Sequence, residues 1–236
     1  MDLPYSTAKK AVLLPLPIIF GMAFIYDQVN PYVFDHRLGF QNYLVIFSVF
    51  VFCIVGLFGI YTWTQSNTPK NAKTYSVETI FDRLFPFVPQ WVWIYNILYQ
   101  LYFLAIILFF PTAGALLEFL FGLTILVLLQ CLCFIYFPTR TPTHWRNYTP
   151  KNLSEKMLHL TYKLDDDCNC FPSMHCSIAS FCTMTMFLAT GWWIWIPLGL
   201  VGLSCLYTKQ HYFLDIPVGI LLGVLVHWIT FGFLLI

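Results

Sequence analysis

The stretch TKQHYFLDIPVG, residues 208–219, places a histidine and an aspartate at the start of an apolar run that extends to residue 235. A run of about 20 apolar residues is long enough to cross the hydrocarbon core of a bilayer as a helix. An ionisable side chain inside such a helix is costly and therefore indicates a function. The stretch FPSMHCSIASF, residues 171–181, also places a histidine at the start of an apolar segment. We expect the two stretches to face each other.

The composition is that of a membrane protein. Of the 236 residues, 59% are hydrophobic and 10% are charged, whereas a soluble domain has about 25% charged residues. The net charge is +1, with no basic tail, so no nucleic-acid partner is expected. The eight cysteines lie mostly in apolar segments, where cysteine acts as a small hydrophobe. Cys168 and Cys170 lack the CxxC spacing of a zinc site, so we interpret the cysteines as structural or incidental, and we expect no cofactor.

The hydropathy pattern predicts an all-α fold, a polytopic membrane helix bundle with six or possibly seven transmembrane helices. Gly191, followed by two tryptophans, predicts a tight turn at the membrane interface. Without an internal repeat, residues 1–236 are expected to form one domain, with its motifs between about 78 and 225. The six expected spans are residues 43–62, 91–110, 114–137, 175–190, 192–207 and 213–235, and residues 10–26, which contain Pro15 and Pro17, are the uncertain seventh.

Two long polar loops, residues 63–90 and 138–174, separate the expected spans. Counting crossings places both loops and residues 208–212 on one face of the membrane. The count is the same whether or not residues 10–26 cross. The polar residues of the chain therefore gather on one membrane surface.

His211 and Asp215 are four residues apart, so they lie on one face if both belong to a helix. A carboxylate beside an imidazole fixes its tautomer and leaves the second nitrogen free as a nucleophile or base. The alternative interpretation is a structural hydrogen bond between packed helices.

The motif FPSMH is typical of a helix start. Pro172 suits the first turn, and Ser173 adds a hydroxyl to backbone N–H groups that bind phosphate at a helix N-terminus. His175 is placed to protonate a leaving oxygen. The alternative is an ordinary capped helix with an interfacial histidine. Lys209, Arg140 and Arg146 are the cations available to neutralise phosphate oxygens.

Taken together, PSMH and SCLYTKQHYFLD resemble the second and third signature motifs of the type 2 phosphatidic acid phosphatase (PAP2) superfamily, usually PSGH and SRxxxxxHxxxD. Ser204 lies seven residues before His211, and Asp215 lies four after it, as in the pattern. The segment FDRLFPFVPQWVWIY (81–95) and TKQHYxxD look like the branch that contains bacterial lipid phosphatases, inositol phosphorylceramide synthases and sphingomyelin synthases. The resemblance covers roughly residues 78–225.

The resemblance implies a role for each matching position. His211 is then the nucleophile that forms a phosphohistidine, Asp215 orients it, His175 is the general acid, and Ser173 is a phosphate ligand. The family generally needs no metal, so the acidic run at residues 165–167 is interpreted as a solvated loop.

The sequence departs from the family pattern at three places. Met174 replaces the glycine of PSGH, and Cys205 replaces the arginine that normally follows the first serine, so Lys209 is expected to supply that charge. The first motif, KxxxxxxRP, has only FPTRTP (137–142) as a counterpart, with Arg140 as the expected phosphate contact and Arg146 as the second candidate.

The resemblance implies an integral-membrane lipid phosphatase, acting on a phosphate or pyrophosphate ester held within the bilayer. Transfer of the headgroup to a lipid alcohol is the alternative, because both reactions share their first half, and a non-enzymatic membrane protein or transporter is the second alternative. The sequence leaves the lipid and the oligomeric state open.

Two arguments about topology conflict. If seven spans cross, every lysine and arginine except Arg37 lies on the site's face, and the positive-inside rule places that face in the cytoplasm. The resemblance implies an extracytoplasmic or lumenal site. Because a phosphate site needs basic residues for its chemistry, we favour the latter.

Overall fold

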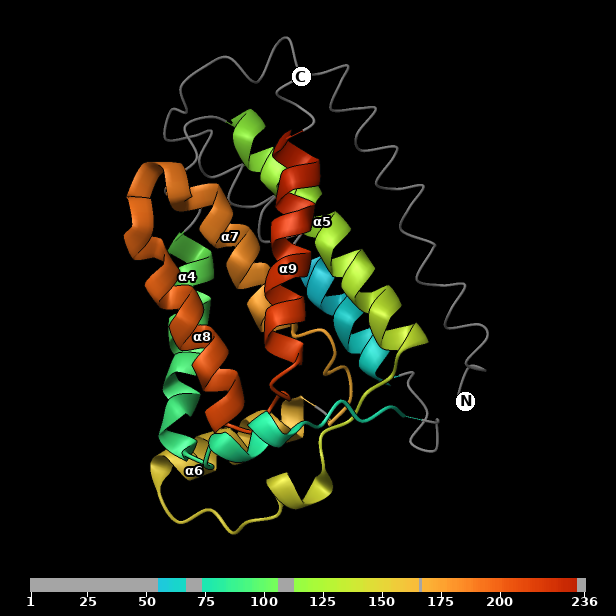
Figure 1. Ribbon diagram of the computed structural model, residues 1–236, viewed down its shortest axis with the longest axis vertical. Helices are drawn as coiled ribbons and strands as arrows, with labels where there is room; N and C mark the ends of the chain where they lie inside the picture. The colour runs from blue at the N-terminus through green and yellow to red at the C-terminus, as the bar shows by residue number, and fades with distance from the viewer. Residues whose placement is uncertain (1–54, 67–73, 106–112, 166, 233–236) are drawn as a thin grey trace.

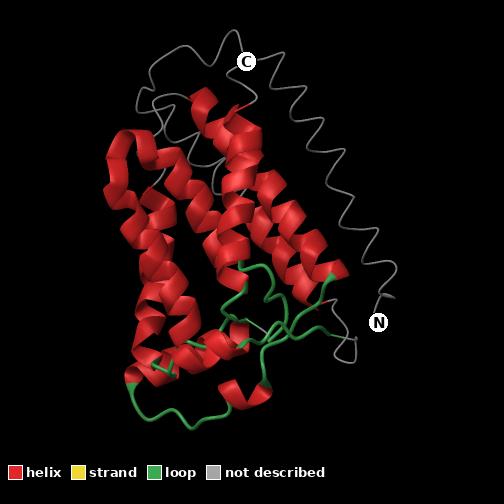
Figure 2. Cartoon of the chain, viewed as in Figure 1, coloured by secondary structure: helices red, strands yellow, loops and turns green. Residues whose placement is uncertain are grey.

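The computed structural model describes residues 55–66, 74–105, 113–165 and 167–232, and these residues form an array of helices (Figure 1). No strand occurs among them (Figure 2), and two isolated bridges join Tyr75 to Thr139 and Arg140 to Cys168. The helical elements are residues 55–66, η1 (Ile80–Leu84), η2 (Pro89–Trp91), η3 (Ile94–Leu98), α4 (Tyr99–Ala105), α5 (Ala113–Tyr136), η5 (Thr143–Arg146), α6 (Leu153–Leu164), α7 (Met174–Thr190), η6 (Gly191–Ile194), α8 (Trp195–Tyr207), α9 (Asp215–His227) and η7 (Trp228–Gly232).

Three helical segments are long and apolar enough to cross a membrane: Gly114–Tyr136, Met174–Tyr207 and Asp215–Gly232. The 34-residue segment Met174–Tyr207 folds back on itself at η6, so α7 and α8 lie side by side (Figure 1). Gly191 has φ +70° at this turn, a conformation that glycine adopts without steric cost. The predicted turn at Gly191 is therefore confirmed.

Four predicted spans are helical over most of their length, namely 114–137, 175–190, 192–207 and 213–235. The predicted span 91–110 is helical from Ile94 to Ala105, and the span 43–62 is helical from residue 55, where its description starts. Residues 10–26 lie outside the described residues. The all-helical prediction holds for the described part of the chain, and the total of six or seven spans stays a prediction.

The helix pair α7 and α9 is packed at backbone distance. A Cβ atom on Gly219 would lie 2.5 Å from the carbonyl oxygen of Ser173, and one on Gly223 would overlap the carbonyl oxygen of Ser177. The hydroxyl of Ser180 donates to the carbonyl of Ile220 at 3.0 Å. Small residues four apart allow this close approach. In lipid, where the hydrophobic effect does not drive helices together, the close van der Waals contact and the interhelical hydrogen bond stabilise the pair.

Helix α5 packs against this pair and carries the apolar core. Gly122 lies against Phe181 of α7 and Thr230 of η7. Phe119 and Leu123 are buried in the same cluster. The Tyr61 ring, from the helix at residues 55–66, contacts Phe134 of α5 edge-on, with ring centroids 6.1 Å apart. The core therefore holds together helices that are far apart in the sequence.

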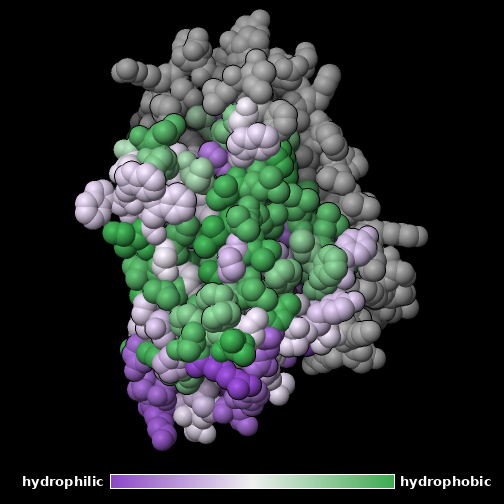
Figure 3. Space-filling view, in the orientation of Figure 1, coloured by the Kyte–Doolittle hydropathy of each residue, from purple (hydrophilic) through white to green (hydrophobic). Residues whose placement is uncertain are grey.

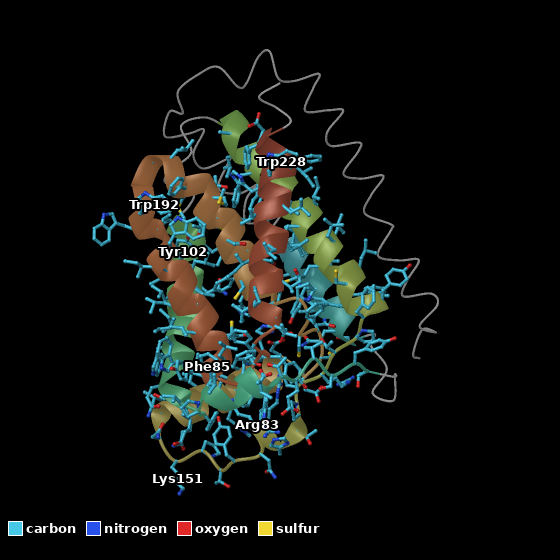
Figure 4. The ribbon with its side chains drawn as sticks, viewed as in Figure 1. Arg83, Phe85, Tyr102, Lys151, Trp192 and Trp228 are labelled. Atoms are coloured by element: carbon cyan, nitrogen blue, oxygen red, sulfur yellow. The ribbon has the colours of Figure 1, made fainter. Side chains whose placement is uncertain are left out.

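The outer surface is apolar along the helices and polar at one end (Figure 3). Leu188, Leu221 and Leu225 are exposed on α7 and α9, as expected for side chains that face lipid. Exposed Trp192 and Trp228 lie toward one end of the bundle, and Arg83 and Lys151 lie at the other (Figure 4). Tryptophan favours the membrane interface, so the bundle has the polarity of a membrane-spanning unit. We call the end with Arg83 and Lys151 the polar end.

Helix α6 lies across the polar end (Figure 1). It occupies the middle of residues 138–174, which the sequence predicted to be a loop, so that part of the prediction is wrong. Asn152 caps the helix by accepting the N–H of Glu155 at 2.9 Å. Leu158 is buried against the bundle, whereas Leu160 and Leu164 are exposed. The helix forms because one of its faces finds an apolar partner at the bundle's end.

Replacing Gly223 with alanine should destabilise the protein, because the new Cβ overlaps a backbone carbonyl that cannot move without separating α7 from α9. Overpacking of this kind costs about 1–3 kcal/mol. The measurement is the thermal unfolding midpoint of purified protein in one detergent.

The matched control is Gly199→Ala on α8, where nothing lies within 4 Å of the new Cβ. Alanine favours a helix over glycine by up to about 1 kcal/mol, so this variant should melt at or above the wild-type temperature. A Gly223→Ala protein that melts like wild type would show that the close helix contact is wrong.

Candidate active site

His211 lies in the loop between α8 and α9, not on a helix. Helix α9 begins at Asp215, so the condition that both residues share a helix is not met. The Asp215 carboxylate instead turns back over the loop, where Oδ2 accepts the N–H of Tyr212 at 2.8 Å and lies 3.2 Å from Nδ1 of His211. The four-residue spacing works because the turn folds the aspartate back onto the histidine.

The hydrogen bonds of His211 define its tautomer. Nδ1 lies 2.9 Å from the carbonyl oxygen of Cys170 as well as 3.2 Å from Oδ2 of Asp215. A carbonyl oxygen only accepts, so Nδ1 carries the hydrogen. In the neutral ring the lone pair is therefore on Nε2.

Burial and Asp215 act in opposite directions on the pKa of His211. Burial of the ring favours the neutral form and lowers the pKa, whereas the hydrogen bond and negative charge of Asp215, with smaller contributions from Cys176 and Asp165, raise it by more. The pKa of His211 is raised above its ordinary value of 6.5 as a result. The neutral, nucleophilic ring therefore becomes the major form only above that ordinary value.

His175 lies in the first turn of α7 and faces His211. The two ring centroids are 6.0 Å apart in an edge-to-face arrangement. Nδ1 of His175 lies 3.2 Å from the hydroxyl of Tyr95, and the rings of Tyr95 and Tyr99 pack against the imidazole with centroids at 4.2 and 4.6 Å. The tyrosines hold the ring, and Nε2 of His175 is the nitrogen left for another partner.

The N-termini of α7 and α9 are joined directly. The N–H of Ser173 donates to the carbonyl of Asp215 at 3.0 Å, and the hydroxyl of Ser173 caps α7 by accepting the N–H of Cys176 at 3.4 Å. Pro172 precedes this cap, so its predicted place in the first helical turn is wrong. Ser173 is fully buried and fixes the relative position of the two histidine-bearing segments.

Arg146 is the arginine that reaches the histidines' pocket. Its NH1 donates to the carbonyl of Asp165 at 2.8 Å, its NH2 donates to Oε1 of Gln210 at 3.1 Å, and its Nε donates to the hydroxyl of Thr141 at 3.2 Å. These bonds use three of the five N–H groups of a guanidinium. The side chain is rigidly held and brings a positive charge to the pocket.

The other predicted substrate contacts lie outside the pocket lining. Arg140 forms an ion pair with Asp167. Lys209 donates to the carbonyl of Asp82 at 3.0 Å and lies over the Trp145 ring at 4.8 Å; burial lowers its pKa. Ser204 is buried and donates to a carbonyl one turn earlier in α8. The sequence placed Arg140 before Arg146 as the phosphate contact, whereas in the structure Arg146 lines the pocket and Arg140 does not.

The pocket opens between α7, the loop before it and residues 208–214, and it contains about 260 Å³ of empty space counted to its open mouth. It brings together segments that are more than 100 residues apart. The residues that line it are Tyr61, Arg146, Asp165, Cys168, Asn169, Cys170, Met174, His175, Gln210 and His211.

Asp165, the first residue of the acidic run, lines this pocket, which the sequence did not indicate. Asp165 accepts hydrogen bonds from the Tyr61 hydroxyl at 2.7 Å and from Nε2 of Gln65 at 2.9 Å, and Asp167 pairs with Arg140. For these two residues the interpretation as a solvated loop is wrong. The partners of Asp165 on residues 55–66 are about 100 residues away, and no local pattern indicates that pairing.

Asp82 was also missed, although it lies in the segment that carries the resemblance. It is buried, and its Oδ1 accepts the N–H of Phe213 at 2.6 Å, while Oδ2 accepts the N–H and hydroxyl of Thr79 at 2.6 and 2.9 Å. With the Lys209 bond to its carbonyl, Asp82 holds both ends of the His211 loop. The available signal was a single acidic residue, next to Arg83, in the otherwise apolar stretch FDRLFPF.

No group of three or more His, Cys, Asp or Glu residues able to hold a metal ion occurs within residues 55–66, 74–105, 113–165 and 167–232. The absence of a metal requirement therefore stays a prediction from the sequence.

Comparison with known proteins gives one family. A family model described as the PAP2 superfamily matches residues 76–229, more than half of the chain. No curated protein and no solved structure matched the chain. The matched region contains both histidines, Asp215, Arg146 and Asp82.

The titration of His211 should depend on Asp215. Asp215→Asn keeps an acceptor for Nδ1–H but removes the negative charge, so the pKa of His211 should fall below its wild-type value. The measurement is a pH titration of ¹⁵N-labelled histidine by NMR in nanodiscs, with His211 assigned by its loss in His211→Ala.

Asp167→Asn is the matched control, because Asp167 pairs with Arg140 rather than with the histidine. It should leave the His211 titration unchanged. The neutral wild-type ring should also show the Nδ1–H tautomer, and an unchanged midpoint in Asp215→Asn would contradict the charge assignment.

Proposed function

The chain belongs to the PAP2 superfamily, a membership that implies phosphatase or phosphotransferase chemistry, and we propose that it hydrolyses a phosphate or pyrophosphate ester of a lipid. The observation that carries this proposal is the meeting of His175 and His211, with ring centroids 6.0 Å apart in one pocket. Two imidazoles this close together can both contact one phosphoryl group that is bound in the pocket they line. One ring then attacks the phosphorus while the other donates a proton to the leaving oxygen.

In the first half-reaction, Nε2 of His211 attacks the phosphorus. Its lone pair is available because Nδ1–H is held by Cys170 and Asp215. The bond from phosphorus to the lipid oxygen breaks, and His175 in its protonated form gives its Nε2 proton to that oxygen. The products are a lipid alcohol and a phosphohistidine at His211.

In the second half-reaction, His175 is neutral and acts as the base. A water molecule gives a proton to Nε2 of His175 and attacks the phosphorus, and the electron pair of the P–N bond returns to His211. The cycle ends with inorganic phosphate and both imidazoles in their starting states. Asp215 stabilises the positive charge that His211 carries while it is phosphorylated or protonated.

Arg146 is the cation we assign to the phosphoryl oxygens, because it lines the pocket and its position is set by three hydrogen bonds. A fixed positive charge in a partly dry site stabilises the charge that develops in the transition state. Ser173, Ser204, Arg140 and Lys209 act instead through the structure: they cap helices, close ion pairs and hold the loop that carries His211. We propose no metal for either step.

The position of the pocket along the helix bundle suits a lipid substrate. The pocket lies where α7 and α9 begin, close to α6 and the polar end, while apolar side chains cover the helices beyond it (Figures 1 and 3). A headgroup at the membrane surface can enter while its acyl chains stay in the bilayer. On the resemblance to the lipid phosphatase branch, we place this polar end on the extracytoplasmic or lumenal side.

The test is phosphate release by purified protein from short-chain phosphatidic acid and from a polyprenyl pyrophosphate, with a chelator present. Wild-type protein should release phosphate, and His211→Ala should lower the rate by at least about a thousandfold while keeping its unfolding midpoint. Rapid quench in alkaline SDS, in which the acid-labile P–N bond survives, should trap a ³²P-labelled phosphohistidine in wild type and none in His211→Ala. Full activity in His211→Ala would contradict the mechanism.

Transfer to an alcohol shares the first half-reaction, so a second assay separates it from hydrolysis. Phospholipid supplied with ceramide should yield no new phosphosphingolipid if water is the acceptor. A phosphosphingolipid product would indicate a headgroup transferase. No turnover of any lipid phosphate by wild type would favour a non-enzymatic membrane protein.

A further inference from the structure

Two carboxamides that line the pocket have amide atoms without hydrogen-bond partners within the described part of the chain. Asn169 is 4% exposed, and neither its Nδ2 nor its Oδ1 has a partner there. Gln210 is 2% exposed, and its Nε2 has none. Both residues line the same pocket as His175 and His211. Buried polar groups are almost always paired in native proteins, so three orphaned atoms in one pocket indicate that a ligand pairs with them.

The assignment of the amide atoms is firm on chemical grounds. Gln210 accepts a hydrogen bond from NH2 of Arg146 at 3.1 Å, and a guanidinium only donates, so the accepting atom is the oxygen and the unpaired atom is the N–H₂ group. For Asn169 both atoms are unpaired, so exchanging them changes nothing. The pocket therefore offers two unpaired donors and one unpaired acceptor.

The backbone of Asn169 adopts an uncommon conformation that places its side chain at the pocket. Its φ is +63°, a left-handed conformation that asparagine tolerates better than most residues. The next residue is Cys170, whose carbonyl accepts Nδ1–H of His211. The turn that fixes the His211 tautomer thus also delivers the Asn169 carboxamide to the pocket.

The donors and the acceptor suit different ligand atoms. Phosphoryl oxygens accept hydrogen bonds, so the N–H groups of Asn169 and Gln210 fit them beside Arg146. The oxygen of Asn169 would repel a phosphoryl oxygen and needs an O–H donor. In the second half-reaction the attacking molecule supplies that O–H group.

Resting on the proposed function, we infer that Asn169 bridges the phosphoryl group and the attacking water, donating through Nδ2 and accepting through Oδ1, while Gln210 donates to the phosphoryl group. Water has two O–H groups, so it can give one proton to Nε2 of His175 and donate a hydrogen bond to Oδ1 of Asn169 through the other O–H. An alcohol has a single O–H, which His175 must take. Asn169 therefore selects water over an alcohol as the acceptor of the phosphoryl group.

The experiment follows phosphohistidine breakdown in the full-length protein with short-chain phosphatidic acid as donor and added glycerol as competing acceptor. Asn169→Gly removes the acceptor, and the positive φ suits glycine. The ratio of glycerol phosphate to inorganic phosphate should rise about tenfold over wild type, the effect of losing one hydrogen bond to the competing water.

Asn169→Asp separates the two functions of the side chain. It keeps an acceptor oxygen, so the product ratio should stay at the wild-type value. It replaces the donor with a negative charge, so inorganic phosphate should inhibit about tenfold more weakly. Gln210→Glu should weaken phosphate inhibition similarly and also leave the ratio unchanged.

Asn147→Asp is the control for the added charge, because Asn147 is exposed and does not line the pocket. It should match wild type in both measurements. The unfolding midpoint of ligand-free Asn169→Gly should stay within about 3 °C of wild type, because no hydrogen bond within the described protein is lost. A large drop would show that Asn169 is structural and would overturn the inference.

An active wild type with an unchanged product ratio in Asn169→Gly, or unchanged phosphate inhibition in Asn169→Asp and Gln210→Glu, would overturn this inference alone. A wild type that releases no phosphate from any lipid phosphate would overturn the proposed function, and the inference with it.

Discussion

The close contact between α7 and α9 is the constraint on which the rest of the structure depends. Gly219 and Gly223 leave no room for a side chain against the backbone of α7, so the two helices can only lie at backbone distance. The hydrogen bond from Ser173 to the carbonyl of Asp215 then joins their N-termini. Since His175 follows one N-terminus and His211 precedes the other, this one contact sets the distance between the two imidazoles.

Around that contact, buried polar groups hold the loops in place. Gln130 of α5 donates to the carbonyl of Pro172 and accepts from the hydroxyl of Ser177 at 3.1 Å. Asp82 holds the loop that carries His211 from the opposite side. Buried polar networks are stabilising when every member is paired. The orphaned amides of Asn169 and Gln210 depart from that rule, and they do so inside the pocket where a ligand would complete them.

The hydropathy of the chain was sufficient to predict most of the helices, because a long apolar run has few alternatives to a membrane helix. Residues 113–136 and the turn at Gly191 follow from hydropathy and glycine alone. Helix α6 was missed, because it is too polar to read as a span and is stabilised by packing on the bundle. Asp165 was misinterpreted for a similar reason: its partners, Tyr61 and Gln65, are distant in the chain, and only folding brings them together.

The sequence by itself was enough to select the histidines and the aspartate to which we assign the chemistry. The spacing of His211 and Asp215, the helix-start motif before His175 and the apolar runs around them are local patterns, so they can be read without coordinates. The tertiary structure alone decided which cation enters the pocket, Arg146 rather than Arg140 or Lys209, and which amides face it. Those choices depend on how residues 138–174 fold over the bundle, and the physical reason is that a loop's path is set by partners scattered along the whole chain, whereas a membrane helix is set by its own sequence.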